Sequence, residues 1–480
     1  MAVTRLDVFM DGIRAGHLDR NSSGRVDFLY DHDYLNDPRS TPLSLSVPKS
    51  DQPSRPKAIN AFLAGLLPDN DATLKTWARK YQVSAASPFG LLAHVGMDTA
   101  GALQIVPEGA DPSDSHRRDG DIEWLSEDDM ASLVRGLADH QSDWDSTRHR
   151  GRWSLAGAQS KLALFSDGTR WGIPNDSTPT TRILKPSIDG YDGHDVNEYM
   201  SMEAASRLGL AAAKSDLMSF GGEQVFVSQR YDRLQDMDGR WIRLHQEDFC
   251  QAMAVHPSKK YQNEGGPGTS QIADLLNRLP ASRATDAKQR FFDYMAYNVA
   301  IGATDAHAKN FSLVHSGSDS VLAPLYDVAS VASYHQDAAN ASAMRVGAHI
   351  RLSEINEADF VSLGRRLNIS PDEAANRYAD IKSRIPDVFQ EIAQEIEQTG
   401  RNVDMARHIA DAVSAHASNN RDRFGVLILP EPIERPIGSV GQDVTSDYLT
   451  KSNDVPVRSH DNAGNDVRAH SRKKPKRDGA

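Results

Sequence analysis

The pattern of hydrophobic and polar positions predicts a small α+β domain over residues 1–110. The short run Leu6–Met10 favours a β-strand, and a turn at Asp11–Gly12 ends it. A helical pattern follows near Ala58–Tyr81 and is interrupted around Pro68. The mixture of strand and helix predicts a separate domain ahead of the rest of the chain.

The next two segments carry the strand-rich part of the chain. Residues 111–149 begin with many Asp, Ser and Gly residues, which predicts a linker, and continue as a helical connection. Residues 150–255 alternate strands and turns around one helix, which is predicted over Val196–Leu208. Asp195 is the expected N-cap of this helix. Gly209 is its expected stop, because glycine readily adopts the left-handed conformation that ends helices.

Residues 256–428 are predicted to form a larger, mostly helical lobe. Arg290–Ile301 carries aromatic and aliphatic residues around most of its circumference, so this helix should be largely buried. Ser370–Glu373 has the pattern of a capping box with proline at the first helical position. Residues 429–480 have few apolar residues and no helical period, which predicts a disordered tail. A strand-rich lobe followed by a helical lobe suits a nucleotide clamp between the two.

Composition narrows the class of protein. The 480 residues are 39% hydrophobic and 25% charged, as in a soluble globular protein of two or three domains. No apolar run approaches a membrane span, and no secretion signal opens the chain. The single cysteine, Cys250, excludes an intramolecular disulfide and fits a reducing cytoplasm, where it is expected to be a small buried hydrophobe.

The net charge indicates how the protein could bind nucleic acid. The net charge of −12 argues against broad nonspecific binding of nucleic acid. The last ten residues, 471–480, are nevertheless basic, and two interpretations stay open for them: a solvated end of the tail, or a contact with DNA phosphates.

The most informative stretch is Gly302–Ser312 together with Leu325–Val328. It contains Asp305, then Asn310 five residues on, then Asp327 beside apolar residues. In kinase catalytic loops an Asp accepts the proton of the attacking hydroxyl, an Asn at this spacing coordinates Mg²⁺, and a later Asp holds the metal. Asp and Asn are also common turn residues, so these three residues alone are equally compatible with a structural role.

Two further motifs contain residues that could contact phosphates. Ser154–Leu164 is a small-residue turn followed by a β-favouring run, and the N–H groups of such a turn can bind phosphate oxygens. It has one glycine and matches neither the P-loop nor the kinase glycine-rich motif, so a plain turn is the alternative. Lys185 ends another β-favouring run, as the phosphate-pairing lysine of a kinase does. Glu198 and Glu203 are its candidate ion partners, and Glu198 is preferred.

Two more segments allow two interpretations each. Val225–Arg233 runs from an apolar strand into a polar turn, which fits either a hinge that reads the adenine edge or a strand end with salt-bridging charges. Lys259–Gly268 is a loop, either a connector or a lid that contacts substrate. No zinc-ligand spacing and no Gly-x-Ser-x-Gly elbow occur in the sequence, so a zinc site and a serine hydrolase are not supported.

Together, these segments resemble the HipA family of bacterial toxin kinases in their order and spacing. The resemblance covers residues 1–425 and is weaker over the first domain. It is carried by Ser154–Leu164, Thr178–Lys185, Asn197–Leu210, Arg230–Arg233, Arg243–Gln251, Lys260–Gly268, Gly302–Ser312 and Leu325–Asp327. It implies an α+β, two-lobed protein-kinase-like fold that transfers phosphate from ATP to serine or threonine.

The resemblance also implies roles for individual residues. Asp305 would be the catalytic base, Asn310 and Asp327 the Mg²⁺ ligands, and Lys185 a contact of the ATP phosphates. The phosphate loop would be Ala156, Gly157, Ala158, Gln159, Ser160 and Lys161. The nucleotide pocket would be lined by Gln229, Arg230, Tyr231, His307, Ala308, Lys309, Asn310, Tyr326, Asp327, Val328 and Ala329. Ser160 departs from the family, which has an acidic residue at this point of the loop.

Ser154 matches the loop serine whose autophosphorylation ejects the phosphate loop and inactivates kinases of this family. A phosphoserine carries about two negative charges, which repel the ATP phosphates.

For partners, the resemblance implies a HipB-like helix-turn-helix antitoxin, operator DNA bound through it, and two toxin copies bridged by an antitoxin dimer. It implies a cytoplasmic toxin of a type II toxin–antitoxin system. Phosphorylation of a protein such as an aminoacyl-tRNA synthetase would then inhibit translation, and no membrane partner is expected. Two alternatives stay open: a co-repressor subunit with vestigial catalysis, and a small-molecule or lipid kinase on the same scaffold.

Overall fold

The computed structural model describes residues 3–110, 121–139, 153–188, 190–334 and 340–419. The predicted disordered tail over 429–480, its basic end and most of the predicted linker lie outside the described residues. No helix in the described part of the chain is both long and apolar enough to cross a bilayer.

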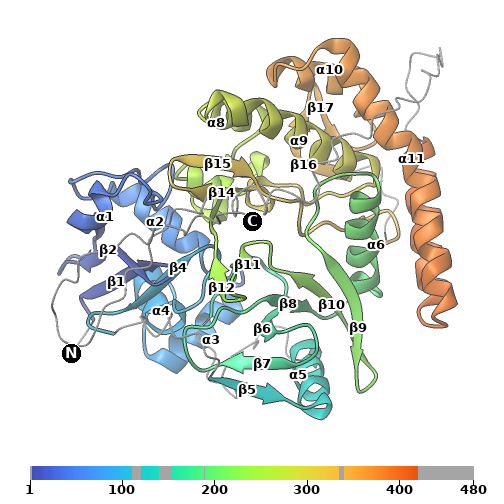
Figure 1. Cartoon of the computed structure of the whole chain (residues 1–480). Helices are drawn as coiled ribbons and strands as arrows, with labels where there is room; N and C mark the ends of the chain where they lie inside the picture. The colour runs from blue at the N-terminus through green and yellow to red at the C-terminus, as the bar shows by residue number, and fades with distance from the viewer. Residues whose placement is uncertain (1–2, 111–120, 140–152, 189, 335–339, 420–480) are drawn as a thin grey trace, which may run out of the picture. The chain divides into compact units, whose positions relative to one another are not determined.

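The N-terminal domain is an antiparallel sheet covered by helices, drawn in blue in Figure 1. Its strand order is β3 (Val26–Tyr30), β2 (Ile13–Arg20), β1 (Arg5–Met10) and β4 (Leu103–Pro107). Its helices are α1 (His32–Asn36), α2 (Pro56–Gly65), α3 (Asp71–Tyr81) and α4 (Pro88–Val95). The predicted strand over Leu6–Met10 and the helical pattern broken around Pro68 are confirmed. Phe62, Trp77 and Phe89 fill the core between sheet and helices.

The second sheet is six-stranded, and every neighbouring pair in it is antiparallel. The order is β5 (Ile122–Leu125), β7 (Trp171–Pro174), β6 (Leu162–Ser166), β8 (Arg182–Lys185), β10 (Glu223–Gln229) and β9 (Ser215–Phe220). Lys185 is paired with Phe226 at the end of β8. Because the two strands are antiparallel, Gln229 at the end of β10 lies opposite Arg182 at the start of β8.

The segment predicted as a linker and helical connection, residues 111–149, contributes more than a connection. It supplies the edge strand β5, which pairs with β7, and helix α5 (Glu127–Asp139). Met130 and Val134 of α5 pack with the apolar side chains of the six-stranded sheet. The prediction missed this because four-residue strands carry too little periodicity to be recognised in the sequence.

Helix α6 (His194–Arg207) begins two residues earlier than predicted. Gly193, with φ of 67°, holds the N-cap position, so the prediction of Asp195 as N-cap is wrong. Asp195 instead lies in the first turn, where the helix dipole favours an acid, and accepts a hydrogen bond from Gln224 Nε2 on β10 at 2.6 Å. Gly209, with φ of 85°, follows the helix end, as predicted.

The C-terminal lobe is mostly helical. Its helices are α7 (Phe249–Ala252), α8 (Thr269–Leu276), α9 (Ala281–Ala300), α10 (Glu357–Arg366), α11 (Pro371–Gln398) and α12 (Val403–Asn419). Short sheets accompany them: β11 (Arg233–Gln235) with β12 (Trp241–Arg243), β13 (His245–Asp248) with β14 (Ser312–Ser316) and β15 (Asp319–Leu322), and β16 (Ala341–Val346) with β17 (His349–Arg351). Helix α9 is buried around most of its second half, as predicted.

Two smaller predictions in this lobe are also tested. Ser370 caps α11, and its hydroxyl accepts the Glu373 N–H at 3.2 Å, so the forward half of the predicted capping box is present. Cys250 is buried in α7, as expected, and burial raises the pKa of its thiol.

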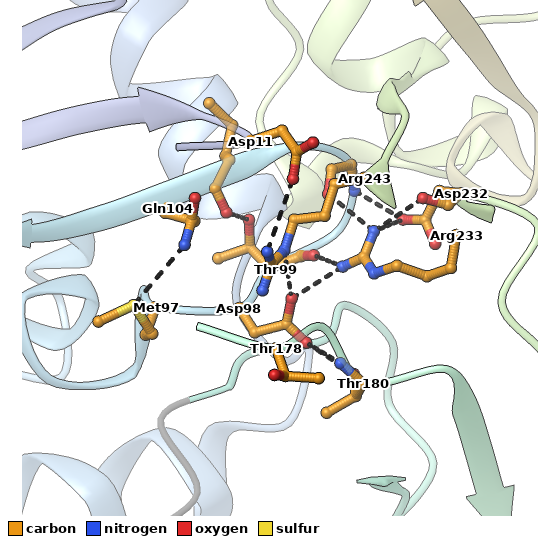
Figure 2. A network of polar contacts seen from close by, with 12 residues as sticks. Asp11, Met97, Asp98, Thr99, Gln104, Thr178, Thr180, Asp232, Arg233 and Arg243 are labelled. Carbon is orange, nitrogen blue, oxygen red and sulfur yellow. Dashed lines mark hydrogen bonds and ion pairs between the residues drawn. The ribbon is translucent and has the colours of Figure 1, made fainter. Parts of the chain in front are cut away.

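A buried network of charges joins the N-terminal domain to the second sheet (Figure 2). We call it the arginine network: Asp98, Asp232, Arg230, Arg233 and Arg243. One carboxylate oxygen of Asp98 accepts from Arg233 Nη2 and from Arg243 Nε, each at 2.9 Å. Asp232 accepts from Arg230 at 3.0 Å and from the Gly101 N–H at 2.7 Å. Burial alone would raise the pKa of Asp98, but the nearby arginines hold it well below its ordinary value.

Candidate active site

A cavity of about 680 Å³ brings most of the predicted site residues together. That volume is within the range of small-molecule sites. The predicted residues that line it are Ala156, Gly157, Ala158, Gln159, Ser160, Lys161, Lys185, Gln229, Arg230, Tyr231, Asp305, His307, Lys309, Asn310, Tyr326, Asp327 and Ala329. The other predicted pocket residues, Ala308 and Val328, do not line it and pack in the hydrophobic core instead.

A buried lysine lies between two carboxylates in this cavity. Lys185 Nζ donates to Glu198 Oε1 at 2.6 Å and makes a short contact with Asp327 Oδ1. Burial lowers the pKa of Lys185, but the two carboxylates outweigh burial and raise it above its ordinary value. The preference for Glu198 is confirmed, since Glu203 pairs with Arg207 at 2.8 Å instead.

Asp327 sits in an unusual backbone conformation. Its φ is +59°, a left-handed value that non-glycine residues adopt at a cost. In this conformation the Asp327 carboxylate contacts Lys185. Burial would raise the pKa of Asp327, but Lys185 and Lys161 hold it well below its ordinary value, so the group is an anion.

The predicted phosphate loop is a tight turn at the cavity wall. Gly157 has φ of +111°, a backbone conformation that favours glycine, and a Cβ added there would also displace Lys161 Nζ, which would lie 2.3 Å away. Lys161 Nζ donates to the Ala156 carbonyl at 2.7 Å. Gln159 Nε2 donates to the Pro186 carbonyl at 3.0 Å and ties the loop to the end of β8.

Two residues of this loop, Ser160 and Lys161, are buried. Ser160 is buried and its hydroxyl donates to the Leu137 carbonyl at 3.3 Å, so the residue that departs from the family holds the end of α5. Lys161 is buried beside Lys185, and burial followed by that like charge lowers its pKa to about 8.

The two catalytic-loop candidates, Asp305 and Asn310, both line the cavity. The Asn310 amide donates from Nδ2 to the Asp305 carbonyl at 2.8 Å, which leaves its oxygen as the group available for a ligand. Asp305 has 60% of its side chain exposed, whereas Asp327 has 35%. The more exposed carboxylate is therefore the one that an acceptor from solution can reach.

Asp305 has neighbours that the sequence did not assign. Tyr261 Oη donates to Asp305 Oδ1 at 2.5 Å, and His307 Nε2 lies 3.8 Å from Asp305 Oδ2. Tyr261 comes from the loop Lys259–Gly268, so this loop contacts the site and is not only a connector. Burial followed by the charge of Asp305 raises the pKa of Tyr261, which keeps its hydroxyl a donor.

The strand end at the cavity wall has the salt-bridging charges of one interpretation of Val225–Arg233, whereas a hinge that reads the adenine edge stays a prediction. Arg230 belongs to the arginine network: its guanidinium donates to Thr180 Oγ1 at 2.9 Å and to the Thr99 carbonyl at 2.7 Å. Tyr231 stacks on Tyr326 with ring centroids 5.6 Å apart, and both rings line the cavity. The charges are thus structural, and the aromatic pair forms the cavity wall.

Ser154 lies behind the phosphate loop, outside the cavity lining. It is fully buried, and its hydroxyl donates to the Leu66 carbonyl of the N-terminal domain at 2.7 Å. Its N–H donates to the Asp98 carbonyl at 2.9 Å. A kinase can reach this hydroxyl only after the loop has left its place.

A strand-rich lobe and a helical lobe, with a Lys–Glu pair and an Asp, Asn and Asp set around one cavity, define a two-lobed protein-kinase-like fold of the α+β class. A family model described as the HipA-like C-terminal domain matches residues 153–396, and the HipA N-terminal domain model matches residues 6–106. The chain belongs to the HipA family.

Relatives agree with this assignment. The chain is 34% identical over 423 residues to the "Putative kinase Y4mE" of Sinorhizobium fredii, covering 87% of this chain and 98% of that protein. It is 29% identical over 367 residues to the serine/threonine-protein kinase toxin HipA of Shewanella oneidensis, covering 73% of this chain and 81% of that protein. A solved complex of Shewanella oneidensis HipA with HipB and operator DNA has a similar fold, with a TM-score of 0.73 and 24% identity over 86% of this chain and 96% of that one.

Proposed function

We propose that this protein is an ATP-dependent serine/threonine kinase and the toxin of a type II toxin–antitoxin system. The observation that carries the proposal is the buried Lys185 between Glu198 and Asp327, facing Asp305 and Asn310 in one cavity. A lysine fixed by a glutamate on the next helix, an acceptor carboxylate and a pair of oxygen ligands are the parts that phosphoryl transfer requires.

The residues present fit ATP with Mg²⁺. Lys161 and Lys185 supply positive charge for phosphates, and the turn at Gly157 lets a ligand approach the backbone closely. Among the described residues no group of three or more His, Cys, Asp and Glu could hold a metal by itself. A site built from Asn310, Asp327 and substrate phosphates matches how Mg²⁺ is bound, and the ion would offset the phosphate charge there.

Each side chain then has one task. Asp305 accepts the proton of the serine or threonine hydroxyl as that oxygen attacks the terminal phosphate. The Tyr261 hydroxyl, which now donates to Asp305, has to leave Oδ1 for the acceptor to take its place. Lys185 stays fixed by Glu198 and contacts the phosphates, while Tyr231 and Tyr326 flank the base.

Autophosphorylation at Ser154 would inactivate the enzyme. The serine hydroxyl donates to the Leu66 carbonyl in a fully buried position. A phosphorylated oxygen has no proton to donate there, and its charge of about −2 would be buried against a carbonyl oxygen. The modified segment therefore could not return, and the phosphate loop would stay displaced.

The proposed partners follow the family. The HipA protein of Shewanella oneidensis forms a complex with HipB and operator DNA. We extend this to a HipB-like helix-turn-helix antitoxin, operator DNA bound through it, and two toxin copies per complex in the cytoplasm. The substrate class is a protein of translation, such as an aminoacyl-tRNA synthetase.

One experiment tests the proposed function. The purified chain is incubated with Mg-ATP, alone and with cell lysate, and phosphosites are mapped by mass spectrometry. Phosphate on Ser154 and on a specific lysate protein supports the kinase toxin. ATP binding without any transfer supports a co-repressor subunit, and transfer to a small molecule alone supports the third alternative.

The pKa of Lys161 makes ATP binding depend on pH. Burial lowers this pKa to about 8, so Lys161 is protonated at pH 7 and largely neutral at pH 9. Bound phosphates favour the charged form, so above pH 8 binding must take up a proton, and affinity should fall by up to about tenfold per pH unit. Calorimetry in two buffers of different ionisation enthalpy measures the uptake. Lys161→Met should abolish it, and equal uptake in that variant would contradict the role.

A further inference from the structure

A short segment of the N-terminal domain, Pro68–Asn70, borders the cavity between α2 and α3. Pro68 pairs with Gly157 in a parallel bridge, and the Asp69 N–H donates to the Gly157 carbonyl at 2.9 Å. The Asn70 amide Nδ2 donates to the Ala158 carbonyl at 3.3 Å. This segment therefore holds the phosphate loop through its backbone and one side chain.

The carboxylate of Asp69 points at two lysines of the helical lobe. One oxygen accepts from Lys309 Nζ at 2.7 Å, and the other oxygen accepts from Lys260 Nζ at 3.0 Å. Only 11% of the Asp69 side chain and 4% of the Lys309 side chain are exposed, so the charges are poorly screened. Burial would raise the pKa of Asp69, but the two lysines lower it, and Asp69 is an anion.

Both lysines are neighbours of the residues proposed for catalysis. Lys309 lies in the loop that carries Asp305 and directly precedes Asn310. Lys260 directly precedes Tyr261, whose hydroxyl donates to Asp305. Without Asp69, two ammonium groups would share a partly buried place and repel each other, so the positions of both lysines depend on this carboxylate.

We infer that Asp69 is a positioning residue of the phosphoryl-transfer site, an inference that rests on the proposed kinase function. Its backbone holds the phosphate loop, while its carboxylate fixes Lys309, which precedes Asn310, and Lys260, which precedes Tyr261. Because both contacts belong to one residue, the loop and the two cations keep one relative position. The N-terminal domain is thus a part of the active site.

The test removes the charge of Asp69 and keeps its size and N–H. In Asp69→Asn, kcat per ATP-binding site should fall by about 10- to 100-fold, because small displacements of positioned groups cost this much. The affinity for ATP should not fall, because the variant loses the negative charge of Asp69 near the phosphates. Counting ATP-binding sites by titration separates this effect from loss of folded protein. Asp71→Asn, which changes an exposed acid in the first turn of α3, is the matched control.

A double variant adds a readout that a purely structural role would not move. In Asp69→Asn, Lys309 and Lys260 compete for the single, neutral oxygen of the Asn amide. Lys260→Met in the same chain removes the competitor, so kcat per site should rise again above that of Asp69→Asn alone.

The outcomes separate the two proposals. If the wild-type chain transfers no phosphate, the proposed function fails and the role of Asp69 fails with it. If the wild-type chain is active and Asp69→Asn matches Asp71→Asn in kcat per site, the role of Asp69 alone is wrong. The role of Asp69 is also wrong if the total rate of transfer falls only as far as the number of ATP-binding sites does. It is wrong as well if kcat per site does not recover in the double variant.

Discussion

Replacing Asp305 by Asn is expected to lower the rate of phosphoryl transfer by about 10²- to 10⁴-fold, the usual contribution of a positioned general base. Asn has the same shape but cannot accept the proton of the acceptor hydroxyl. The cavity should stay intact, because the Asp305 carboxylate is 60% exposed and the contact that aligns Asn310 uses the Asp305 backbone carbonyl. Transfer is measured as phosphate incorporation per ATP-binding site.

The control for this variant is Asp238→Asn, an exposed acid in the turn between β11 and β12 that pairs with Arg240 at 3.0 Å. It should keep the wild-type rate and the wild-type affinity for ATP. Unchanged transfer in Asp305→Asn would show that another group accepts the proton. Unchanged toxicity in cells would favour the co-repressor subunit over the kinase.

Replacing Asp98 by Asn is expected to reduce the free energy of unfolding by about 3–5 kcal/mol, the typical cost of removing one partner from a buried ion pair. The Asp98 carboxylate bonds Arg233 and Arg243, each at 2.9 Å, and Thr180 Oγ1 at 2.6 Å (Figure 2). After the change three buried arginines would have Asp232 as their remaining buried carboxylate in the arginine network. Urea unfolding, followed by tryptophan fluorescence, measures the loss.

Glu354→Gln is the matched control, because Glu354 and Arg351 form an exposed pair 3.5 Å apart. Such surface pairs contribute about 0–1 kcal/mol, so this variant should unfold near the wild-type midpoint. A loss in Asp98→Asn no larger than in this control would mean that the arginine network does not hold the N-terminal domain in place. A loss of ATP affinity alone would instead assign Asp98 to the cavity wall.

Local features of the fold could be predicted from the sequence. The strand at Leu6–Met10, the break around Pro68 and the buried helix within α9 depend on neighbouring residues along the chain, whose spacing the sequence displays directly. The same holds for the motif from Asp305 to Asn310, since both side chains belong to one short loop. The pairing of Lys185 with Glu198 was predictable because strand and helix follow each other.

Contacts between distant segments could not be predicted. The sequence predicts only a connection where strand β5 lies, because the pairing of β5 with β7 involves residues far along the chain. Arg230 lines the cavity, but the contacts of its guanidinium with Thr180 and the Thr99 carbonyl join segments that are distant in the sequence. The position of Tyr261 against Asp305 likewise depends on how a loop folds over another lobe.

The order of the lobes can be predicted from the amino-acid sequence alone, and so can the main helices and the residue types available for phosphoryl transfer. Tertiary structure decided which of those residues share a cavity, and it added Asp69, which no motif singles out. The reason is physical. Hydrogen bonds within helices and turns join near neighbours and leave a period in the sequence, whereas ion pairs such as Asp69 with Lys309 join segments that meet only when the chain has folded.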